Sequence, residues 1–384
     1  MLSFLGSRQL PLRLHQLTTM LLHAYVVQWR PLSFASWILR ARRTLKAGGR
    51  ARHIGCFGPS PHLVWEATAE CNLKCIYCHA VGGARRPGEL SFSEAVKLMR
   101  QAWDLGVDIF VFSGGEPLLR RDLLALIAEA RRIGLNCFVA TNGTLITKRV
   151  ARAFAKLDVG VVLGLDAATP SVHDKLRGID GAHRRALEGL RNSVAEDLYL
   201  HLNVAATRLN LHEVPKVVEL GSGLGAHSFF IYFFKPAGRG VAQRSLALMP
   251  SQSFKLLEAL AELQRRVKSL IIPVGAPHYW AWLAKRRGLS DDRVLKLAFS
   301  GCAAKSGMIY VDAEGWLTRC PFLQERLGNV KSSRLNQLLS KPLPKPSPTC
   351  SECSFKEACG GCLFDAAHGS LACPLSKPRG ALHG

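Results

Sequence analysis

The stretch "HLVWEATAECNLKCIYC", residues 62–78, decides the fold of this chain. It opens with an apolar run that predicts a buried strand, and cysteines follow at positions 71, 75 and 78. The cysteine loop therefore lies at the carboxyl end of a strand, where barrel enzymes place their chemistry. A closed zinc site needs a fourth ligand, and only His79 offers one nearby. An iron–sulfur cubane held by three thiolates instead keeps one iron free for another ligand.

Five further apolar runs follow this strand, separated by helical patterns. They predict strands at 107–114, 135–141, 159–166, 198–207 and 227–234. Helices are predicted near 92–105, 119–133, 147–156, 182–195 and 211–222. Six strands with intervening helices predict an α/β fold, a partial six-strand β/α TIM-type barrel whose open side suits a large substrate. Continuous apolar strands are typical of a parallel sheet buried on both faces.

Composition divides the chain into five segments. Residues 1–61 are a basic amphipathic helical extension with nine Lys and Arg and no carboxylate, and 62–240 are the barrel core. A helical connector (241–299), a small cysteine-rich α+β domain (300–376) and a tail (377–384) follow. We expect the extension to pack as helices on the main domain. The alternatives are contact with a membrane surface and an organellar transit peptide.

Charge and cysteine content narrow the class of protein. The 51 Lys and Arg against 28 Asp and Glu give a formal net charge of +23, which favours anionic partners. An arginine-rich or heat-adapted proteome is the alternative explanation. No run of 18 uncharged apolar residues occurs, so no spanning helix is expected. The twelve cysteines are clustered and no signal peptide is evident, which predicts metal or iron–sulfur ligands in a reducing cytoplasm.

Cys71, Cys75 and Cys78, with Tyr77 before the last cysteine, resemble the C-x3-C-x2-C signature of radical S-adenosylmethionine (SAM) enzymes. The resemblance implies that these catalytic cysteines hold a [4Fe–4S] cluster whose open iron binds SAM. It also implies cleavage of SAM to a 5′-deoxyadenosyl radical that abstracts hydrogen from a substrate. The electron would come from a donor such as ferredoxin or flavodoxin.

Three further motifs at strand ends are similar to the SAM-binding motifs of that family. "SGGEP" (113–117) looks like the GGEP motif, which implies that Ser113, Gly114, Gly115 and Glu116 hold the SAM amino group. "ATNGT" (140–144), with Thr141 and Asn142, is similar to the TNG motif. "GLDAATPSVHDKLRG" (164–178) resembles a stretch that would place Asp166 near the ribose and Arg177 near the SAM carboxylate. Gly164 stands where the family often has serine.

A second cysteine group resembles the SPASM extension, which follows radical SAM barrels and carries auxiliary [4Fe–4S] clusters. The family pattern would assign a distal cluster to Cys350, Cys353, Cys359 and Cys373. It would assign a nearer cluster to Cys302, Cys320 and Cys362, one thiolate short. We therefore hypothesise an open iron or a non-cysteine ligand there. Two zinc ribbons are the disfavoured alternative, because they would need eight ligands.

Two features narrow the substrate. Pro321 and Phe322 follow Cys320 where sulfatase-maturing enzymes carry an acidic residue, which argues against formylglycine formation. "FFKPAGRG" (233–240) resembles a loop of members that act on tetrapyrroles, and Lys235 and Arg239 are expected to pair with propionates. A loop with solvated charges is the alternative.

The resemblance therefore implies an oxidoreductase of heme biosynthesis that acts on an anionic tetrapyrrole, for instance by oxidative decarboxylation of propionates. The alternative is a maturase that cross-links peptides. No nucleic-acid partner is expected. A ferredoxin-like electron carrier would need neither "SGGEP" nor a scaffold of six strands.

Overall fold

The computed structural model describes residues 62–289, 291–293, 295, 299, 301–323, 325–342, 348–368 and 373. The extension of residues 1–61, with its Cys56, and the tail of residues 377–384 lie outside the described residues, so what the sequence predicts for them stays a prediction.

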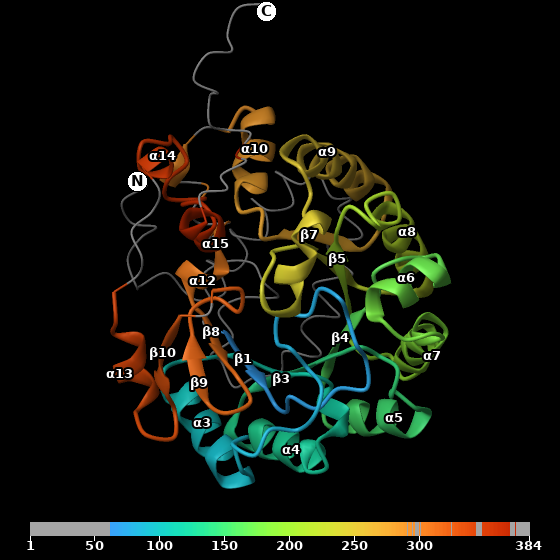
Figure 1. Cartoon of the computed structure of the whole chain (residues 1–384), viewed down its shortest axis with the longest axis vertical. Helices are drawn as coiled ribbons and strands as arrows, with labels where there is room; N and C mark the ends of the chain where they lie inside the picture. The colour runs from blue at the N-terminus through green and yellow to red at the C-terminus, as the bar shows by residue number, and fades with distance from the viewer. Residues whose placement is uncertain are drawn as a thin grey trace, which may run out of the picture.

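The predicted strands are present and pair in parallel in sequence order. They are β1 (His62–Glu66), β2 (Ile109–Ser113), β3 (Asn136–Thr141), β4 (Gly160–Gly164), β5 (Leu200–Ala206) and β6 (Ser228–Phe233). The predicted α/β class with a parallel sheet is confirmed. The sheet curves without closing, since its strand order runs from β10 at one edge to β7 at the other (Figure 1).

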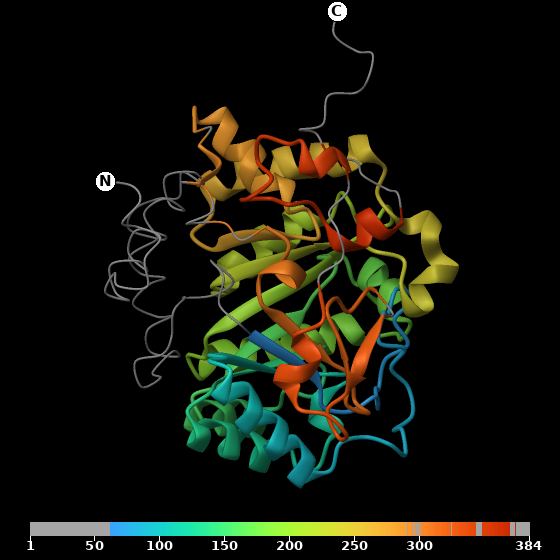
Figure 2. The same cartoon turned by 90° about the vertical axis from the view of Figure 1, so that its left-hand side faces the viewer.

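Four strands extend the sheet beyond the predicted six. β7 (Leu270–Val274) pairs in parallel with β6, and β8 (Met308–Val311) pairs in parallel with β1. β9 (Trp316–Thr318) and β10 (Arg326–Asn329) then add two antiparallel strands. The sheet therefore continues from the barrel strands into the cysteine-rich segment, which lies along one side of it in Figure 2.

The connector predicted as helical contains β7 between the helices α9 (Pro250–Arg266) and α10 (His278–Arg286). The sequence pattern does not predict this strand, because a five-residue apolar run, "LIIPV", has no periodicity that separates a buried strand from a buried helix.

The predicted helices lie along the outer face of the curved sheet (Figure 1). They are α3 (Phe92–Asp104), α4 (Leu123–Ile133), α5 (Lys148–Lys156), α7 (Ala182–Ala195) and α8 (Val214–Leu224). One further helix, α6 (Pro170–Arg177), lies inside the motif of residues 164–178. Short helices complete the described chain: η2 (Pro117–Leu119), η3 (Gly238–Leu246), α12 (Ala303–Ser306), α13 (Leu335–Leu339), α14 (Pro348–Ser351) and α15 (Leu363–Ala367).

The two faces of β1 and β2 differ in burial. Trp65, Phe110 and Phe112 are fully buried; the Trp65 ring meets the two Phe rings edge-on at 6.3 and 6.1 Å between centroids, and the Phe rings lie tilted at 5.0 Å. Burying each such side chain stabilises the fold by about 1.5–3 kcal/mol. Val64 and Val111, which point to the opposite face, are only partly buried. Hydrophobic burial thus fixes the outer face, and the inner face is left to contact a ligand.

No helix within the described ranges has both the length and the apolar character that crossing a bilayer demands.

Candidate active site

The cysteine loop after β1 is fixed by backbone hydrogen bonds to a distant helix end. Lys74 N donates to Arg177 O (3.0 Å) and Ile76 N to Leu176 O (3.0 Å), so the loop lies against the last turn of α6. Cys71 N donates to Gly83 O (2.8 Å), which closes the loop on itself. The three thiols are partly exposed on this fixed backbone.

The segment "PAGRG" after β6 packs on the same loop. The Arg239 guanidinium donates to Cys75 O (3.1 Å) and Gly82 O (3.0 Å), and Arg239 N donates to Cys78 O (2.9 Å). Gly238 has φ +56°, and a Cβ there would lie 2.3 Å from His79 O. Arg239 therefore holds the cysteine loop, whereas the sequence suggested a contact with substrate.

Two of the three thiols, those of Cys71 and Cys75, are costly to ionise without a cation. Burial raises the pKa of Cys75 to about 11, although the Arg177 guanidinium opposes that rise, and the thiols of Cys71 and Cys78 raise it further. Burial also raises the pKa of Cys71. Soft thiolates held this closely suit an iron–sulfur cluster, whose positive iron would stabilise the ionised form.

"SGGEP" crosses directly over the start of the cysteine loop. Gly115 N donates to Thr68 O (2.8 Å) and Glu116 N to Glu70 O (2.7 Å). A Cβ on Gly114 would lie 2.3 Å from Thr68 O, and one on Gly115 would lie 2.3 Å from Glu70 O. The glycines thus permit a close approach of two protein backbones, with the partly buried Ser113 at the end of β2 before them.

The Glu116 carboxylate points into the protein. It accepts hydrogen bonds from Thr141 Oγ1 (2.8 and 2.9 Å), Asn142 N (2.8 Å) and Leu118 N (3.1 Å). Burial raises its pKa to about 7, against the effect of these hydrogen bonds. Asn142 Nδ2 in turn donates to Asn72 Oδ1 (2.8 Å). The "SGGEP" and "ATNGT" segments and the cysteine loop are therefore joined in one network.

Asp166, Arg177 and Tyr77 form a second buried contact. Arg177 Nε lies 2.7 Å from Asp166 Oδ2, and the Tyr77 hydroxyl donates to the same oxygen (2.5 Å). Arg177 also hydrogen-bonds with Cys75. A Cβ on Gly164 would lie 2.4 Å from Arg177 Nη2, which explains why glycine replaces the serine common in the family.

Asn203 on β5 is the register partner of Gly164 on β4. Its side-chain oxygen Oδ1 is buried and has no hydrogen-bond partner among the described residues. This orphaned acceptor lies on the strand next to Gly164 and the Asp166 contact. This acceptor and the three thiols of the cysteine loop together suit a polar cofactor at this end of the sheet.

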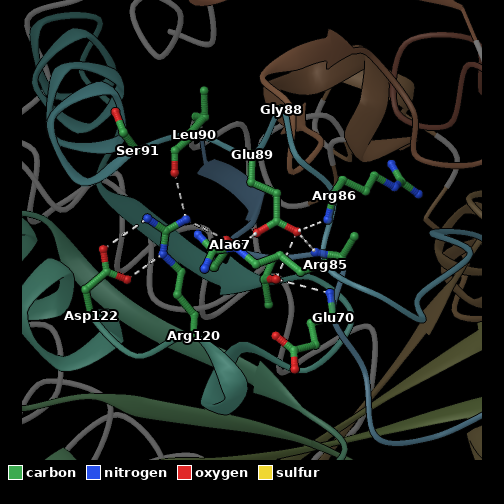
Figure 3. Close-up of polar contacts among 12 residues, drawn as sticks. Ala67, Glu70, Arg85, Arg86, Gly88, Glu89, Leu90, Ser91, Arg120 and Asp122 are labelled. Carbon is green, nitrogen blue, oxygen red and sulfur yellow. Dashed lines mark hydrogen bonds and ion pairs between the residues drawn. The ribbon is translucent and has the colours of Figure 1, made fainter.

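Glu89 and Arg120, which the sequence did not predict as site residues, hold the beginning of the loop. Glu89 Oε1 accepts from Thr68 Oγ1 (3.0 Å), Ala69 N (2.8 Å) and Arg86 N (3.0 Å). Arg120 Nη1 donates to Ala67 O (2.7 Å) and Leu90 O (2.9 Å), while Asp122 pairs with its other nitrogens (Figure 3). No sequence pattern marks Glu89 or Arg120, because their contacts join segments 20 to 53 residues apart.

His79 links the cysteine loop to the cysteine-rich segment. Its Nε2 lies 3.1 Å from the Tyr310 hydroxyl, which donates to Glu66 Oε1 (2.5 Å). Burial lowers the pKa of His79 to about 4. The ring of Phe322, two residues after Cys320, packs edge-on against His79 at 5.2 Å.

The cysteines after residue 300 interact within two sets. Cys302 and Cys362 share a hydrogen bond that lowers the pKa of Cys302 to about 6, and Cys320 interacts electrostatically with Cys302. The second set is Cys350, Cys353, Cys359 and Cys373: burial raises the pKa of Cys350 and of Cys359, and the thiols of Cys353 and Cys373 raise both further. Gly361 lies between the sets, and a Cβ on it would lie 2.5 Å from Cys350 Sγ. The ligand roles of both sets stay predictions.

Cys137 belongs to neither set. It is fully buried on β3, and its thiol lies 3.6 Å from Leu135 O. It therefore occupies a position in the hydrophobic core.

Comparisons with known proteins give a family for this geometry. The family model described as "Radical SAM superfamily" matches residues 65–221. The AdoMet-dependent heme synthase of Methanosarcina barkeri is 29% identical over 320 residues, 79% of this chain and 91% of the relative. Mycofactocin maturase MftC of Mycobacterium tuberculosis is 29% identical over 342 residues, 82% of this chain and 81% of the relative.

A solved structure shares the fold. SuiB of Streptococcus suis bound to S-adenosylmethionine superposes with a TM-score of 0.65 at 18% identity, over 83% of this chain and 78% of SuiB. The same protein bound to its precursor peptide SuiA gives the same TM-score over 83% of this chain and 75% of SuiB.

Proposed function

We propose that this chain, whose residues 65–221 match the radical SAM superfamily, is an enzyme that uses a [4Fe–4S] cluster and SAM and oxidises propionate side chains of a tetrapyrrole in the heme pathway. The observation that carries the proposal is the alignment with an enzyme named AdoMet-dependent heme synthase over 91% of that relative's length. Further relatives are named Fe-coproporphyrin III synthase and pre-heme d1 synthase, which also have tetrapyrrole products.

The chain's own residues divide the work in this proposal. Cys71, Cys75 and Cys78 hold the cluster, and Arg177 with Asp166 orients SAM beside it. Once bound, the cluster and SAM together supply a 5′-deoxyadenosyl radical that takes a hydrogen atom from a substrate. Glu116 acts as a positioning residue, because its carboxylate is saturated by Thr141, Asn142 and Leu118. The remaining SAM-site residues are Tyr77, Ser113, Gly114 and Gly115.

The proposed reaction also needs an electron acceptor. A propionate that loses one hydrogen atom, one electron and carbon dioxide becomes a vinyl group, so each turnover releases an electron besides the hydrogen atom. The cysteines after residue 300 are where auxiliary [4Fe–4S] clusters able to take that electron would be held. A reducing partner such as ferredoxin or flavodoxin would supply the electron for SAM.

Lys235, which the sequence suggested as a partner for a substrate carboxylate, is already paired within the protein, because its Nζ lies 2.6 and 2.7 Å from the two Asp365 oxygens. It lies after the end of β6, and its side chain is 12% exposed. A net charge of +23 gives a surface that attracts a polycarboxylate. Arg239 is also left out of this role because it donates to the backbone of the cysteine loop.

A peptide maturase is the second candidate. It is favoured by the 29% identity to a mycofactocin maturase and by the likeness to SuiB, which was solved with a precursor peptide. Both candidates use the same SAM site and differ in the substrate.

An anaerobic assay with SAM and dithionite separates the two. We expect iron coproporphyrin III to raise the yield of 5′-deoxyadenosine above the substrate-free background and to lose carbon dioxide and two hydrogens per propionate. The Cys75→Ala variant is the control for both products. Stimulation by a precursor peptide, with no change in the porphyrin, would favour the maturase and overturn the tetrapyrrole proposal.

A further inference from the structure

The nearer cysteine set has three thiols where a closed cubane needs four ligands. Cys302 and Cys362 each begin a short helix, α12 and α15, and their thiols share a hydrogen bond. Cys320 is buried beside them, packed with Leu363. The other described cysteines of this segment form the distal set, so among the described residues the fourth ligand has to be another side chain, or it is an external group.

Asp365 stands on the same helix turn as Cys362. Cys362 is the N-cap of α15, and Asp365 is the third residue of the helix. Side chains at these two positions lie at the same helix end, as they do in a capping box. Asp365 acts electrostatically on the Cys362 thiol, and its side chain is only 16% exposed.

Lys235 brings its charge to the same place from the barrel. Its Nζ lies 2.6 and 2.7 Å from the two Asp365 oxygens, and it also acts on the thiols of Cys320 and Cys362. The ion pair therefore lies among the nearer thiols. Lys235 balances the charge of the carboxylate in a site where an unpaired charge would be costly.

His278 is the other donor that faces this pair. Burial lowers its pKa to about 4, and it interacts electrostatically with Lys235 and Asp365. It is a neutral imidazole on α10, outside the segment that carries the thiols. Asp365 is the better candidate, because it shares its helix with Cys362 and carries the negative charge that replaces a thiolate.

We propose that Asp365 completes the nearer cysteine set as its fourth, non-cysteine ligand, with Lys235 bound to the same carboxylate. One carboxylate oxygen donates a lone pair to iron and the other stays with Lys235, so no oxidation state changes. This inference rests on the auxiliary clusters of the proposed function and adds the identity of the missing ligand.

The test uses the full chain with Cys71, Cys75 and Cys78 all changed to Ala, which leaves iron only at the auxiliary sets. The protein is reconstituted anaerobically with ⁵⁷Fe, and its Mössbauer spectrum and iron content are measured. We expect one iron with oxygen coordination in this parent. Asp365→Cys should convert that iron to thiolate coordination at unchanged iron content, and Asp365→Asn should lose iron from the nearer cluster. Glu325→Gln, which removes an exposed carboxylate from the same segment, is the matched control.

Each other outcome overturns the inference. Spectra of Asp365→Cys and Asp365→Asn that match the parent would show that Asp365 does not bind iron. Nitrogen in place of oxygen coordination at this iron in the parent, lost in His278→Ala, would transfer the role to His278. A parent that binds no iron would remove the auxiliary clusters themselves. The porphyrin assay on the unmodified chain tests the substrate separately, so the two failures are distinguishable.

Discussion

The cysteine loop of residues 71–78 is fixed by distant parts of the barrel, whereas the distal cysteines are fixed by local turns and by contacts with the connector. The first loop receives hydrogen bonds from Arg239 and donates to the end of α6. In the second, Cys353 N donates to Cys350 O (3.4 Å) and Cys359 N to Phe355 O (2.9 Å). The sheet thus sets the position of the first loop, whereas local turns together with hydrogen bonds from Glu357 N and Ala358 N to Asp292 set that of the second.

The two regions also balance charge differently. Beside the first thiols, Arg177 is neutralised by Asp166 in a buried pair. Beside the nearer cysteine set, Lys235 is neutralised by Asp365. The side chains of Lys235 and Asp365 are 12% and 16% exposed, whereas those of Arg177 and Asp166 are 10% and 1% exposed. A substitution in the first region should therefore lower both the stability of the fold and the binding of SAM. A substitution in the second region should impair the later transfer of an electron to the auxiliary clusters.

The largest expected effect separates the two regions by function. Cys75→Ala should abolish SAM cleavage, because the [4Fe–4S] cluster loses a ligand. Cys362→Ala should leave SAM cleavage measurable and remove conversion of the substrate. Both yields are measured in one anaerobic reaction, as 5′-deoxyadenosine and as product. Equal loss of 5′-deoxyadenosine in both variants would mean that the two regions depend on each other for SAM cleavage.

Breaking the buried pair at the first region should come next in size. Asp166→Asn leaves the Arg177 charge buried without its partner, which costs about 3–5 kcal/mol in the free energy of unfolding. Affinity for SAM should fall with it. Glu196→Gln is the matched control, because it breaks a pair with Arg152 that is 68% exposed on the arginine side and should cost about 1 kcal/mol or less. Denaturant unfolding under anaerobic conditions measures both.

The sequence predicted those parts of the site that linear patterns record. The cysteine spacings and the strand-end motifs identified residues that the structure brings together, such as Glu116, Thr141 and Asn142. It did not identify Glu89 or Arg120, because a buried carboxylate or guanidinium that binds distant backbone has no characteristic spacing. Periodicity likewise could not separate β7 from a helix.

The buried carboxyl of Glu66, which lies between the two regions, predicts that the free energy of unfolding depends on pH. Burial raises the pKa of Glu66 to about 7 from its ordinary 4.5, so the folded protein keeps a proton there that the unfolded chain has lost. Stability should therefore fall as pH rises from about 4.5 to about 7, by up to about 3 kcal/mol from this group. Glu66→Gln should remove that part of the slope and be relatively more stable at pH 8. Unfolding free energies of both proteins at pH 5 and pH 8 test this, and identical slopes would contradict it.

The smallest expected effect tests whether the first loop depends on the network of Figure 3. In Glu89→Gln the remaining oxygen can still accept from Thr68 and Ala69, but bonds to a neutral amide are weaker than those to a carboxylate. We expect a loss of about 1–2 kcal/mol in unfolding free energy. Arg85→Gln, whose side chain is 63% exposed, is the control and should cost less than about 1 kcal/mol. If both variants cost the same small amount, the buried hydrogen bonds to Thr68 and Ala69 do not fix the loop, and the contrast with the second region rests on Arg239 and α6 alone.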